Sequence, residues 1–127
     1  ILERAEKEGE IKYHGLQGSV HPFYAACHCT VLPSYHEGMA NAMLEASATG
    51  RPVITTTVPG CCETFDEGVT GYGCKAKDVD SLVQAMKQFL SLSPEEREEM
   101  GKAARLKMER EFDREKVNQA YLDAINP

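Results

Sequence analysis

The sequence predicts an α/β fold, in which about four parallel strands form one sheet and helices pack on its faces. Three observations indicate this class. Short apolar runs rich in β-branched residues alternate with helical patterns over residues 1–79. These runs pass through loops into helices, which is the order of right-handed β-α-β crossovers. The rest of the chain then shows helical periodicity alone.

The first predicted elements are short. Residues 2–8 have the pattern of a helix end, which Gly9 closes. Residues 11–14 alternate in polarity and are predicted as a strand. Residues 22–27 begin with proline and are predicted as a short helix, since proline is favoured in a first turn. Residues 29–32 are predicted as a buried strand.

The middle of the chain supplies one helix between two further strands. Residues 41–49 are predicted as a helix, and Gly50 stands where glycine commonly ends one. Residues 53–56 are all β-branched and are predicted as a buried strand. Residues 72–74 are predicted as the last, short strand of the sheet.

Helices complete the predicted fold. Residues 80–91 carry apolar side chains at helical spacing, namely Leu82, Ala85, Met86, Phe89 and Leu90. Ser93 is followed by Pro94 and, three positions on, by Glu96, which is the pattern of a capping box. That helix is expected to reach about residue 112, and Asp113 is expected to cap a last helix.

Size and charge exclude several classes of protein. The 127 residues suffice for one domain, and the absence of an initial Met suggests a chain cut from a longer one. The net charge of −6 argues against a broad nucleic-acid-binding surface. No apolar run approaches the roughly 20 residues of a membrane span, and residues 1–7 do not read as a signal peptide.

The five cysteines suggest reduced thiols in a cytoplasmic protein, because their number is odd and their spacing suits no disulfide framework. Cys27, His28 and Cys29, with Cys61 and Cys62, raise the alternative of a zinc site. Zinc sites usually separate paired cysteines by two or more residues, whereas only one residue separates Cys27 from Cys29. Buried, inert cysteines are therefore expected rather than a zinc site. No metal or cofactor is expected elsewhere in the chain.

Residues 34–46 contain the side chains that best suit a ligand-binding site. Glu37 and Glu45 stand on either side of the small turn Gly38-Met39-Ala40-Asn41, after a predicted strand and at the start of a predicted helix. This order places both glutamates near the carboxyl end of the sheet, where open α/β sheets bind ligands. Carboxylates accept hydrogen bonds from sugar hydroxyls, and the free N–H groups of a helix start bind phosphate.

The string from Pro33 to Ile54 resembles the donor-site signature of the family 4 (group 1) retaining glycosyltransferases, which have the two-domain GT-B architecture. The matching residues read P-S-x2-E-G-M-x-N-x2-L-E-A-x3-G-x-P-V-I. The resemblance continues through residues 58–61, Glu63, and residues 67–72 and 80–82, and so covers about half of the chain in one register.

The resemblance implies that residues 1–127 are a single partial domain, the nucleotide-sugar-binding back portion of a Rossmann-like C-terminal domain of about six strands. The first two β-α units and the N-terminal acceptor-binding domain would lie upstream. It further implies that Glu37 is catalytic and binds the donor sugar. The amides of Gly38, Met39, Ala40 and Asn41 would contact the diphosphate and sugar, and Glu45 the ribose.

Each of these residues also has a plain structural interpretation. Glu37 could be a solvated loop carboxylate, Asn41 a helix cap and Glu45 an exposed helix residue. Glu63, which follows the turn of residues 58–60, is expected to hold a loop rather than to face the donor.

The sequence thus predicts the donor-binding part of an enzyme that moves a sugar from a nucleotide diphosphate sugar to a saccharide or lipid-linked acceptor with retention. The parent enzyme would act in the cytoplasm or at the inner face of the membrane. The 127 residues alone are expected to be inactive, because the family's basic Arg and Lys would lie upstream. The alternatives are a non-catalytic nucleotide-binding module, a homodimer through an exposed sheet edge, and part of a GT-B-like nucleotide-sugar epimerase.

Overall fold

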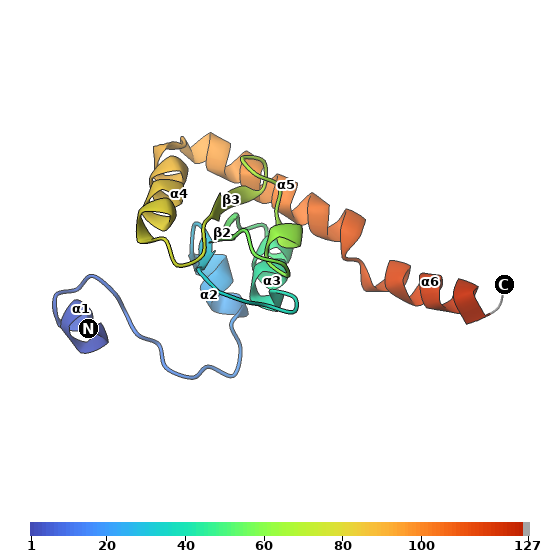
Figure 1. Cartoon of the computed structure of the whole chain (residues 1–127), viewed down its shortest axis with the longest axis horizontal. Helices are drawn as coiled ribbons and strands as arrows, with labels where there is room; N and C mark the ends of the chain where they lie inside the picture. The colour runs from blue at the N-terminus through green and yellow to red at the C-terminus, as the bar shows by residue number, and fades with distance from the viewer. Residues whose placement is uncertain (126–127) are drawn as a thin grey trace.

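The computed structural model describes residues 1–125 and contains a three-stranded parallel sheet. The strands are β1 (Thr30–Leu32), β2 (Val53–Thr56) and β3 (Gly71–Cys74), in the order β1-β2-β3. Val31 pairs with Ile54, which in turn pairs with Tyr72. The predicted α/β class with a parallel sheet is confirmed (Figure 1).

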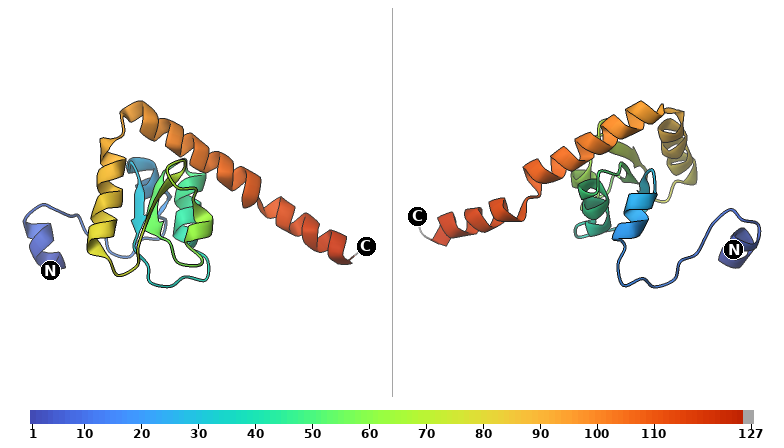
Figure 2. Two further views of the ribbon diagram at one scale, coloured as in Figure 1. Left: turned by 45° about the horizontal axis from the view of Figure 1, so that its top comes forward. Right: turned by 180° about the vertical axis from the view of Figure 1, so that it is seen from behind.

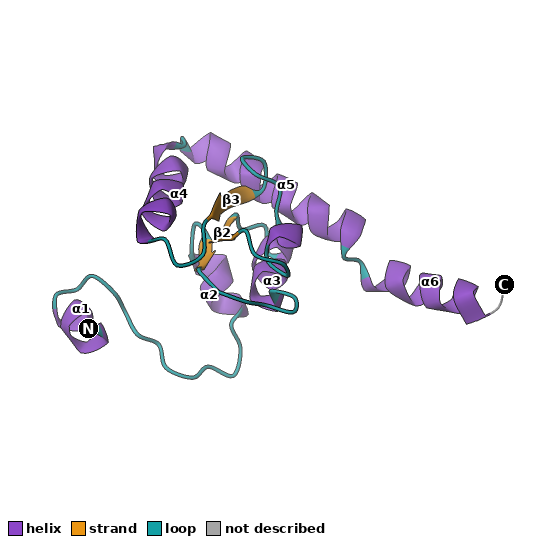
Figure 3. Cartoon of the chain, viewed as in Figure 1, coloured by secondary structure: helices purple, strands orange, loops and turns teal. Residues whose placement is uncertain are grey.

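Helices surround this sheet and form the C-terminal end. They are α1 (Leu2–Lys7), α2 (His21–Ala26), α3 (Asn41–Ala48), α4 (Val79–Ser91), α5 (Pro94–Glu111) and α6 (Arg114–Ile125), with a short 3-10 helix, η1 (Cys62–Thr64), between β2 and β3. Helices α3 and α4 lie on opposite sides of the sheet (Figure 2). Helix α5 packs against α3, and α6 extends away from the sheet (Figure 3). No helix within residues 1–125 is long and apolar enough to cross a membrane.

The predicted strand at residues 11–14 is wrong, so the sheet has three strands rather than about four. The segment is an irregular, exposed loop between α1 and α2, and Figure 1 shows it apart from the sheet. The amide of Tyr13 bonds to the Glu6 carboxylate at 3.3 Å instead of to another strand. A strand needs a neighbour for its N–H and C=O groups, and within the described residues this segment has none.

The core has one cluster on each face of the sheet. Successive side chains of a strand point to opposite faces, so Val53 and Ile54 of β2 enter different clusters. Val53 packs with Met43 and Ala46 of α3 and with Cys61 and Phe65. Ile54 packs with Ala85 and Phe89 of α4, and with Cys74 and Met100.

Glycines allow α5 to cross close to the end of α3. A Cβ at Gly101 would stand 2.3 Å from the carbonyl oxygen of Gly50, which is far inside van der Waals contact.

The capping box predicted for α5 is confirmed: the Glu96 amide donates to Ser93 Oγ at 3.2 Å, and Ser93 N–H donates to Glu96 Oε2 at 2.7 Å. The start of α5 is set by local sequence, whereas its crossing point depends on two glycines that are far apart in the sequence.

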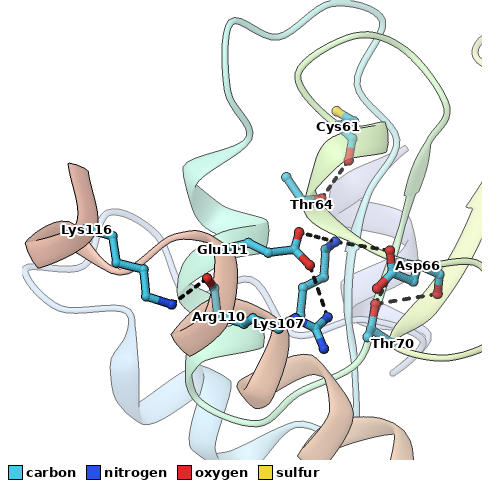
Figure 4. Close-up of polar contacts among 8 residues, drawn as sticks. All are labelled: Cys61, Thr64, Asp66, Thr70, Lys107, Arg110, Glu111 and Lys116. Atoms are coloured by element: carbon cyan, nitrogen blue, oxygen red, sulfur yellow. Dashed lines mark hydrogen bonds and ion pairs between the residues drawn. The ribbon is translucent and has the colours of Figure 1, made fainter. Parts of the chain in front are cut away.

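A buried lysine joins α5 to the turn before β3. Lys107 Nζ lies 3.0 Å from Asp66 Oδ1 and 2.7 Å from Glu111 Oε2 (Figure 4). Burial would lower the pKa of Lys107, but the hydrogen bonds to Glu111 and Asp66 outweigh it, and the pKa is raised. The Asp66 amide also donates to Thr70 Oγ1 at 2.7 Å, so the turn is fixed from both sides.

Candidate functional site

Loops that follow the three strands meet at the carboxyl edge of the sheet. They are residues 33–40 after β1, residues 57–61 after β2 and residues 75–78 after β3. Thr56 Oγ1 donates to the carbonyl oxygen of Ser34 at 2.6 Å, which ties the first loop to β2. Lys77 Nζ of the third loop lies 5.4 Å from the centroid of the Tyr35 ring, and this contact joins the third loop to the first. This edge is where an open parallel sheet offers a ligand crevice.

Glu37 is half-buried in the first of these loops. Ser34 Oγ donates to Glu37 Oε1 at 2.6 Å, the length of a strong hydrogen bond to a carboxylate. Within residues 1–125, Glu37 Oε2 has no hydrogen-bond partner. One carboxylate oxygen is therefore held by the protein, and the other is open to a ligand.

Gly60 lets the second loop approach the backbone of Glu37. Its φ is +83°, and a Cβ there would lie 2.5 Å from the carbonyl oxygen of Glu37 and 2.8 Å from that of Gly38. The Gly60 carbonyl accepts a hydrogen bond from the Ala40 amide at 2.8 Å. Only glycine satisfies both the left-handed conformation and this close approach.

The predicted phosphate-binding amides fall into two pairs. Those of Ala40 and Asn41 are already engaged, with the carbonyl oxygens of Gly60 at 2.8 Å and Met39 at 2.9 Å. Those of Gly38 and Met39 donate to no acceptor within the part of the chain that the structure describes. The first pair thus shapes the turn, and only the second pair is available to a ligand.

Helix α3 begins without a side-chain cap. Its N-cap residue is Ala40, which cannot supply a capping oxygen, and Asn41 is the first helical residue. The alternative of Asn41 as the helix cap is therefore wrong. The amides of Asn41 and Met43 are bonded within the turn, but no side-chain carboxylate caps it, so the positive end of the helix dipole lies at the carboxyl edge of the sheet.

Glu45 lies one turn into α3 and its residue is exposed, while the adjacent Ala46 is buried. The nearest donor is Tyr24 of α2, whose hydroxyl lies 3.5 Å from Glu45 Oε2. Burial first, and the Glu45 carboxylate second, raise the pKa of Tyr24, so this hydroxyl stays a donor. Glu37 and Glu45 thus bracket the start of α3, one before it and one within it.

Glu63 holds the turn between β2 and η1, as the sequence led us to expect. Its Oε2 accepts a hydrogen bond from the Gly60 amide at 2.8 Å. The pKa of Glu63 is lowered by its own backbone amide first and by Cys62 second. Glu63 therefore supports the glycine that abuts Glu37 and acts in the site only through that turn.

Sequence reasoning missed Ser34, Tyr24 and Lys77, which all touch the predicted site residues or their loop. Ser34 lies three positions before Glu37, a spacing that could have indicated the bond. Tyr24 and Lys77 are far from the segment in sequence, and only the folded chain brings them near.

The cysteines form no metal site among residues 1–125, where no group of three His, Cys, Asp or Glu side chains is placed to hold an ion. All five are free thiols. Burial first, and then Cys27, raise the pKa of Cys29 to about 11, and burial also raises the pKa of Cys74. Both groups remain protonated thiols at neutral pH, which suits packing rather than nucleophilic chemistry.

A cavity lies at the opposite, amino edge of the sheet. It measures about 820 Å³ and is lined by residues 48–52 and by one side of α5, including Arg97 and Arg105. Arg105 there is engaged with Glu109 and Ala48, and one terminal nitrogen of Arg97 with the Leu90 carbonyl, whereas the buried Arg97 Nε has no partner within residues 1–125. The carboxyl edge is an open rim of loops in which, among residues 1–125, one oxygen of Glu37 and the amides of Gly38 and Met39 have no hydrogen-bond partner.

The sequence matches the family model described as glycosyl transferases group 1 over residues 2–107. A glycogen synthase from Mycobacterium tuberculosis is 31% identical over 128 residues, which cover 98% of this chain and 30% of that protein. A D-inositol 3-phosphate glycosyltransferase from Kribbella flavida is 37% identical over 82 residues, which cover 65% of this chain and 19% of that protein.

The fold is also similar to folds of solved structures. The fold matches that of Anabaena HepE, in complex with UDP, with a TM-score of 0.88 and 20% identity over 98% of this chain and 34% of HepE. It also matches the C-terminal domain of the group 1 glycosyl transferase LpcC from Francisella tularensis, with a TM-score of 0.72 and 18% identity over 89% of this chain and 60% of that chain. The chain spans about a third of the length of the full-length relatives it matches.

Proposed function

This chain belongs to the group 1 glycosyl transferases, and we propose that it binds the nucleotide diphosphate sugar of a larger enzyme. The parent enzyme moves the sugar to a saccharide or lipid-linked acceptor with retention of configuration at the anomeric carbon. Residues 1–127 form one partial domain of that enzyme, and a further domain binds the acceptor.

The arrangement around the start of α3 is the observation that carries this proposal. A carboxylate with one open oxygen, Glu37, precedes the helix, and an exposed carboxylate, Glu45, follows one turn inside it. Between them lie the unpaired amides of Gly38 and Met39 and an uncapped helix start. A nucleotide sugar has a matching order of groups, because its diphosphate lies between two hydroxyl-bearing rings.

Each group has a proposed partner in the donor. Glu37 accepts hydrogen bonds from the sugar hydroxyls, and Glu45 accepts them from the ribose. The diphosphate lies at the start of α3, where the Gly38 and Met39 amides and the helix dipole favour negative charge. Ala40 and Asn41 shape the turn through their own hydrogen bonds rather than donating their amides to phosphate.

The proposed reaction breaks the bond between the anomeric carbon and the phosphate oxygen and joins that carbon to an acceptor hydroxyl oxygen, whose proton passes to the leaving diphosphate. Glu37 is the proposed catalytic residue, because it holds the sugar ring with the anomeric carbon facing the acceptor. The leaving diphosphate gains charge as the bond breaks, and donors aimed at that charge lower the barrier. The start of α3 supplies part of this stabilisation, and the basic Arg and Lys that the family resemblance implies supply the rest from outside this chain.

Several relatives act on donors or acceptors of these kinds. HepE has been crystallised with UDP and with UDP-glucose. The Campylobacter jejuni relative is an N-acetylgalactosaminyltransferase that acts on a diphospho-undecaprenol, and the Mycobacterium tuberculosis relative is a glycogen synthase. These names support a nucleotide sugar as donor, and they make UDP-glucose the first compound to test.

Calorimetric titration of the 127-residue chain with UDP-glucose, ADP-glucose and GDP-mannose tests the proposal. We expect at least one of them to bind, and we expect Glu37→Ala and Glu45→Ala each to weaken binding about tenfold, the loss of one or two hydrogen bonds to a charged group. Glu95→Ala, which removes an exposed carboxylate at the start of α5, is the control and should leave affinity unchanged. Equal affinities for the Glu37→Ala and Glu95→Ala proteins would refute the proposed site.

A further inference from the structure

Ser34 stands behind the Glu37 carboxylate. We propose that Ser34 is a positioning residue for donor-sugar binding: it holds Glu37 Oε1 and so directs Oε2 toward the sugar. The inference rests on the proposed function and adds a residue to its site. Ser34 touches no part of the donor in this account and acts only through Glu37.

The sheet core holds Ser34 in place. Its carbonyl oxygen accepts a hydrogen bond from Thr56 Oγ1 at 2.6 Å, and Thr56 is 1% exposed. One residue earlier on the same strand, Thr55 Oγ1 donates to the Leu32 carbonyl at 2.9 Å. The backbone leaving β1 is thus fastened twice to a fully buried strand.

A continuous chain of short bonds then reaches the carboxylate. Thr56 binds the Ser34 backbone, and the Ser34 hydroxyl donates to Glu37 Oε1 at 2.6 Å. The backbone of Glu37 is confined from the other side by Gly60, where even a Cβ would lie 2.5 Å from the Glu37 carbonyl oxygen. A glutamate side chain in a loop otherwise samples several rotamers, and binding must then order it. The structure orders it before the sugar arrives.

The competing explanation is that the Ser34–Glu37 bond only closes the loop. The bond joins residues three apart, as many turn-closing bonds do. The two explanations differ in what they predict for ligands with and without a sugar. A loop-closing bond supports the whole site, including the amides of Gly38 and Met39, so its loss should affect UDP and UDP-glucose alike. A positioning bond concerns the sugar alone.

The test compares four variants of the 127-residue chain: Ser34→Ala, Ser34→Thr, Glu37→Ala and Ser91→Ala. The Ser91 hydroxyl also bonds three residues back, to the Gln88 carbonyl, but it lies on α4 away from the site and serves as the control. Dissociation constants for UDP and UDP-glucose, melting temperatures, and the NMR couplings that report the Glu37 χ1 rotamer are measured for each.

We expect Ser34→Ala to weaken UDP-glucose binding about threefold to tenfold, because binding must then order the Glu37 side chain, and to change UDP binding by less than about twofold. The Glu37 couplings should indicate one rotamer in the wild-type and Ser34→Thr proteins and averaging in Ser34→Ala. Ser34→Thr should restore UDP-glucose affinity, and Ser91→Ala should match the wild type.

The failures of the two proposals can be told apart. If Glu37→Ala weakens UDP-glucose binding and Ser34→Ala does not, the Ser34 inference is wrong and the proposed function stands. If Ser34→Ala weakens both ligands alike with a lower melting temperature, the bond only closes the loop and the inference is again wrong. If UDP-glucose binding is unaffected by Glu37→Ala, the sugar role of Glu37 is wrong, and the inference is overturned with it.

Discussion

At the residue scale, the site depends on a few positions where no other side chain satisfies the geometry. Gly60 combines a φ of +83° with contact to the backbone of Glu37, whereas Gly68 has a similar φ of +70° and open space around its α-carbon. The two glycines therefore separate the cost of the left-handed conformation from the cost of the close approach. The left-handed conformation alone costs a non-glycine residue about 1–2 kcal/mol.

We predict that Gly60→Ala lowers the free energy of unfolding by about 3 kcal/mol or more, because it adds a steric clash to the conformational strain. Gly68→Ala, the control, should cost only about 1 kcal/mol. Urea denaturation of both variants measures the difference. Equal losses would mean that the approach of Gly60 to Glu37 is not tight, and that the loop has room to move.

The sequence predicts some residues of the site and misses contacts of others. The pattern located Glu37 and Glu45 on a loop and a helix start, because both are local features. It did not reveal that the Ala40 amide is used by Gly60, or that Tyr24 lies near Glu45, because these contacts join distant segments. Motif and spacing therefore identify the candidate residues, and only the fold decides which of their polar groups remain available.

At the element scale, local signals placed the helices and the strands of the sheet core well. The prediction of residues 53–56 matches β2, and the capping box of α5 is as expected. The exception is residues 11–14. Their alternating pattern is a local feature, but a strand also needs a neighbouring strand, which local sequence does not supply. The propensity of a segment to form a strand has no effect when no neighbouring edge is within reach, which no local pattern reports.

The first prediction about the secondary-structure elements concerns the outer edge of β1. Thr30 N–H bonds toward β2, so the N–H and C=O groups of Val31 point outward, and within residues 1–125 no strand covers them. We expect the chain to form homodimers through this edge at high concentration. Val31→Pro removes the outward N–H and should leave a folded monomer, whereas Val79→Pro, at the exposed first position of α4, should still dimerise. Light scattering measures both, and a wild-type monomer at millimolar concentration would contradict the edge-pairing proposal.

The second prediction at this scale concerns the ion cluster of Lys107, Asp66 and Glu111, which joins α5 to the turn before β3. Hydrogen bonds from Lys107 first, and from Arg110 second, lower the pKa of Glu111 below its ordinary value near 4.5. A carboxyl group with a lowered folded-state pKa stabilises the fold above the unfolded-state pKa and loses that effect as the pH falls through the folded-state pKa. We expect Glu111→Gln to cost up to about 1 kcal/mol at pH 7, since solvent screens a partly exposed pair, and we expect this cost to shrink as the pH falls below the ordinary carboxyl pKa.

Glu109 is the matched control for this measurement. It pairs with Arg105 at 2.7 Å on the same helix, but both side chains are more than half exposed. Glu109→Gln should cost less than about 0.5 kcal/mol at pH 7. Thermal unfolding at several pH values compares the two variants. A Glu111→Gln cost that does not decrease as the pH is lowered towards acid unfolding would contradict the assigned role of the ion pair.

At the scale of the whole molecule, the chain supplies one side of a proposed reaction centre. It spans about a third of its full-length relatives, and the proposed acceptor surface and basic pair lie outside it. We therefore expect the 127-residue chain to bind donor without transferring sugar. An assay for UDP release from UDP-glucose with saccharide acceptors tests this, and sustained turnover by the chain alone would contradict the need for those parts.

The central claim is that a nucleotide sugar binds at the carboxyl edge of the sheet, around the start of α3. The most direct test is an NMR titration of the 127-residue chain with UDP-glucose, in which the shifts of backbone amides locate the ligand. We expect the largest shifts to fall on Gly38, Met39 and the first turn of α3. Shifts concentrated instead around Arg97 and Arg105, at the cavity on the amino edge, would contradict it.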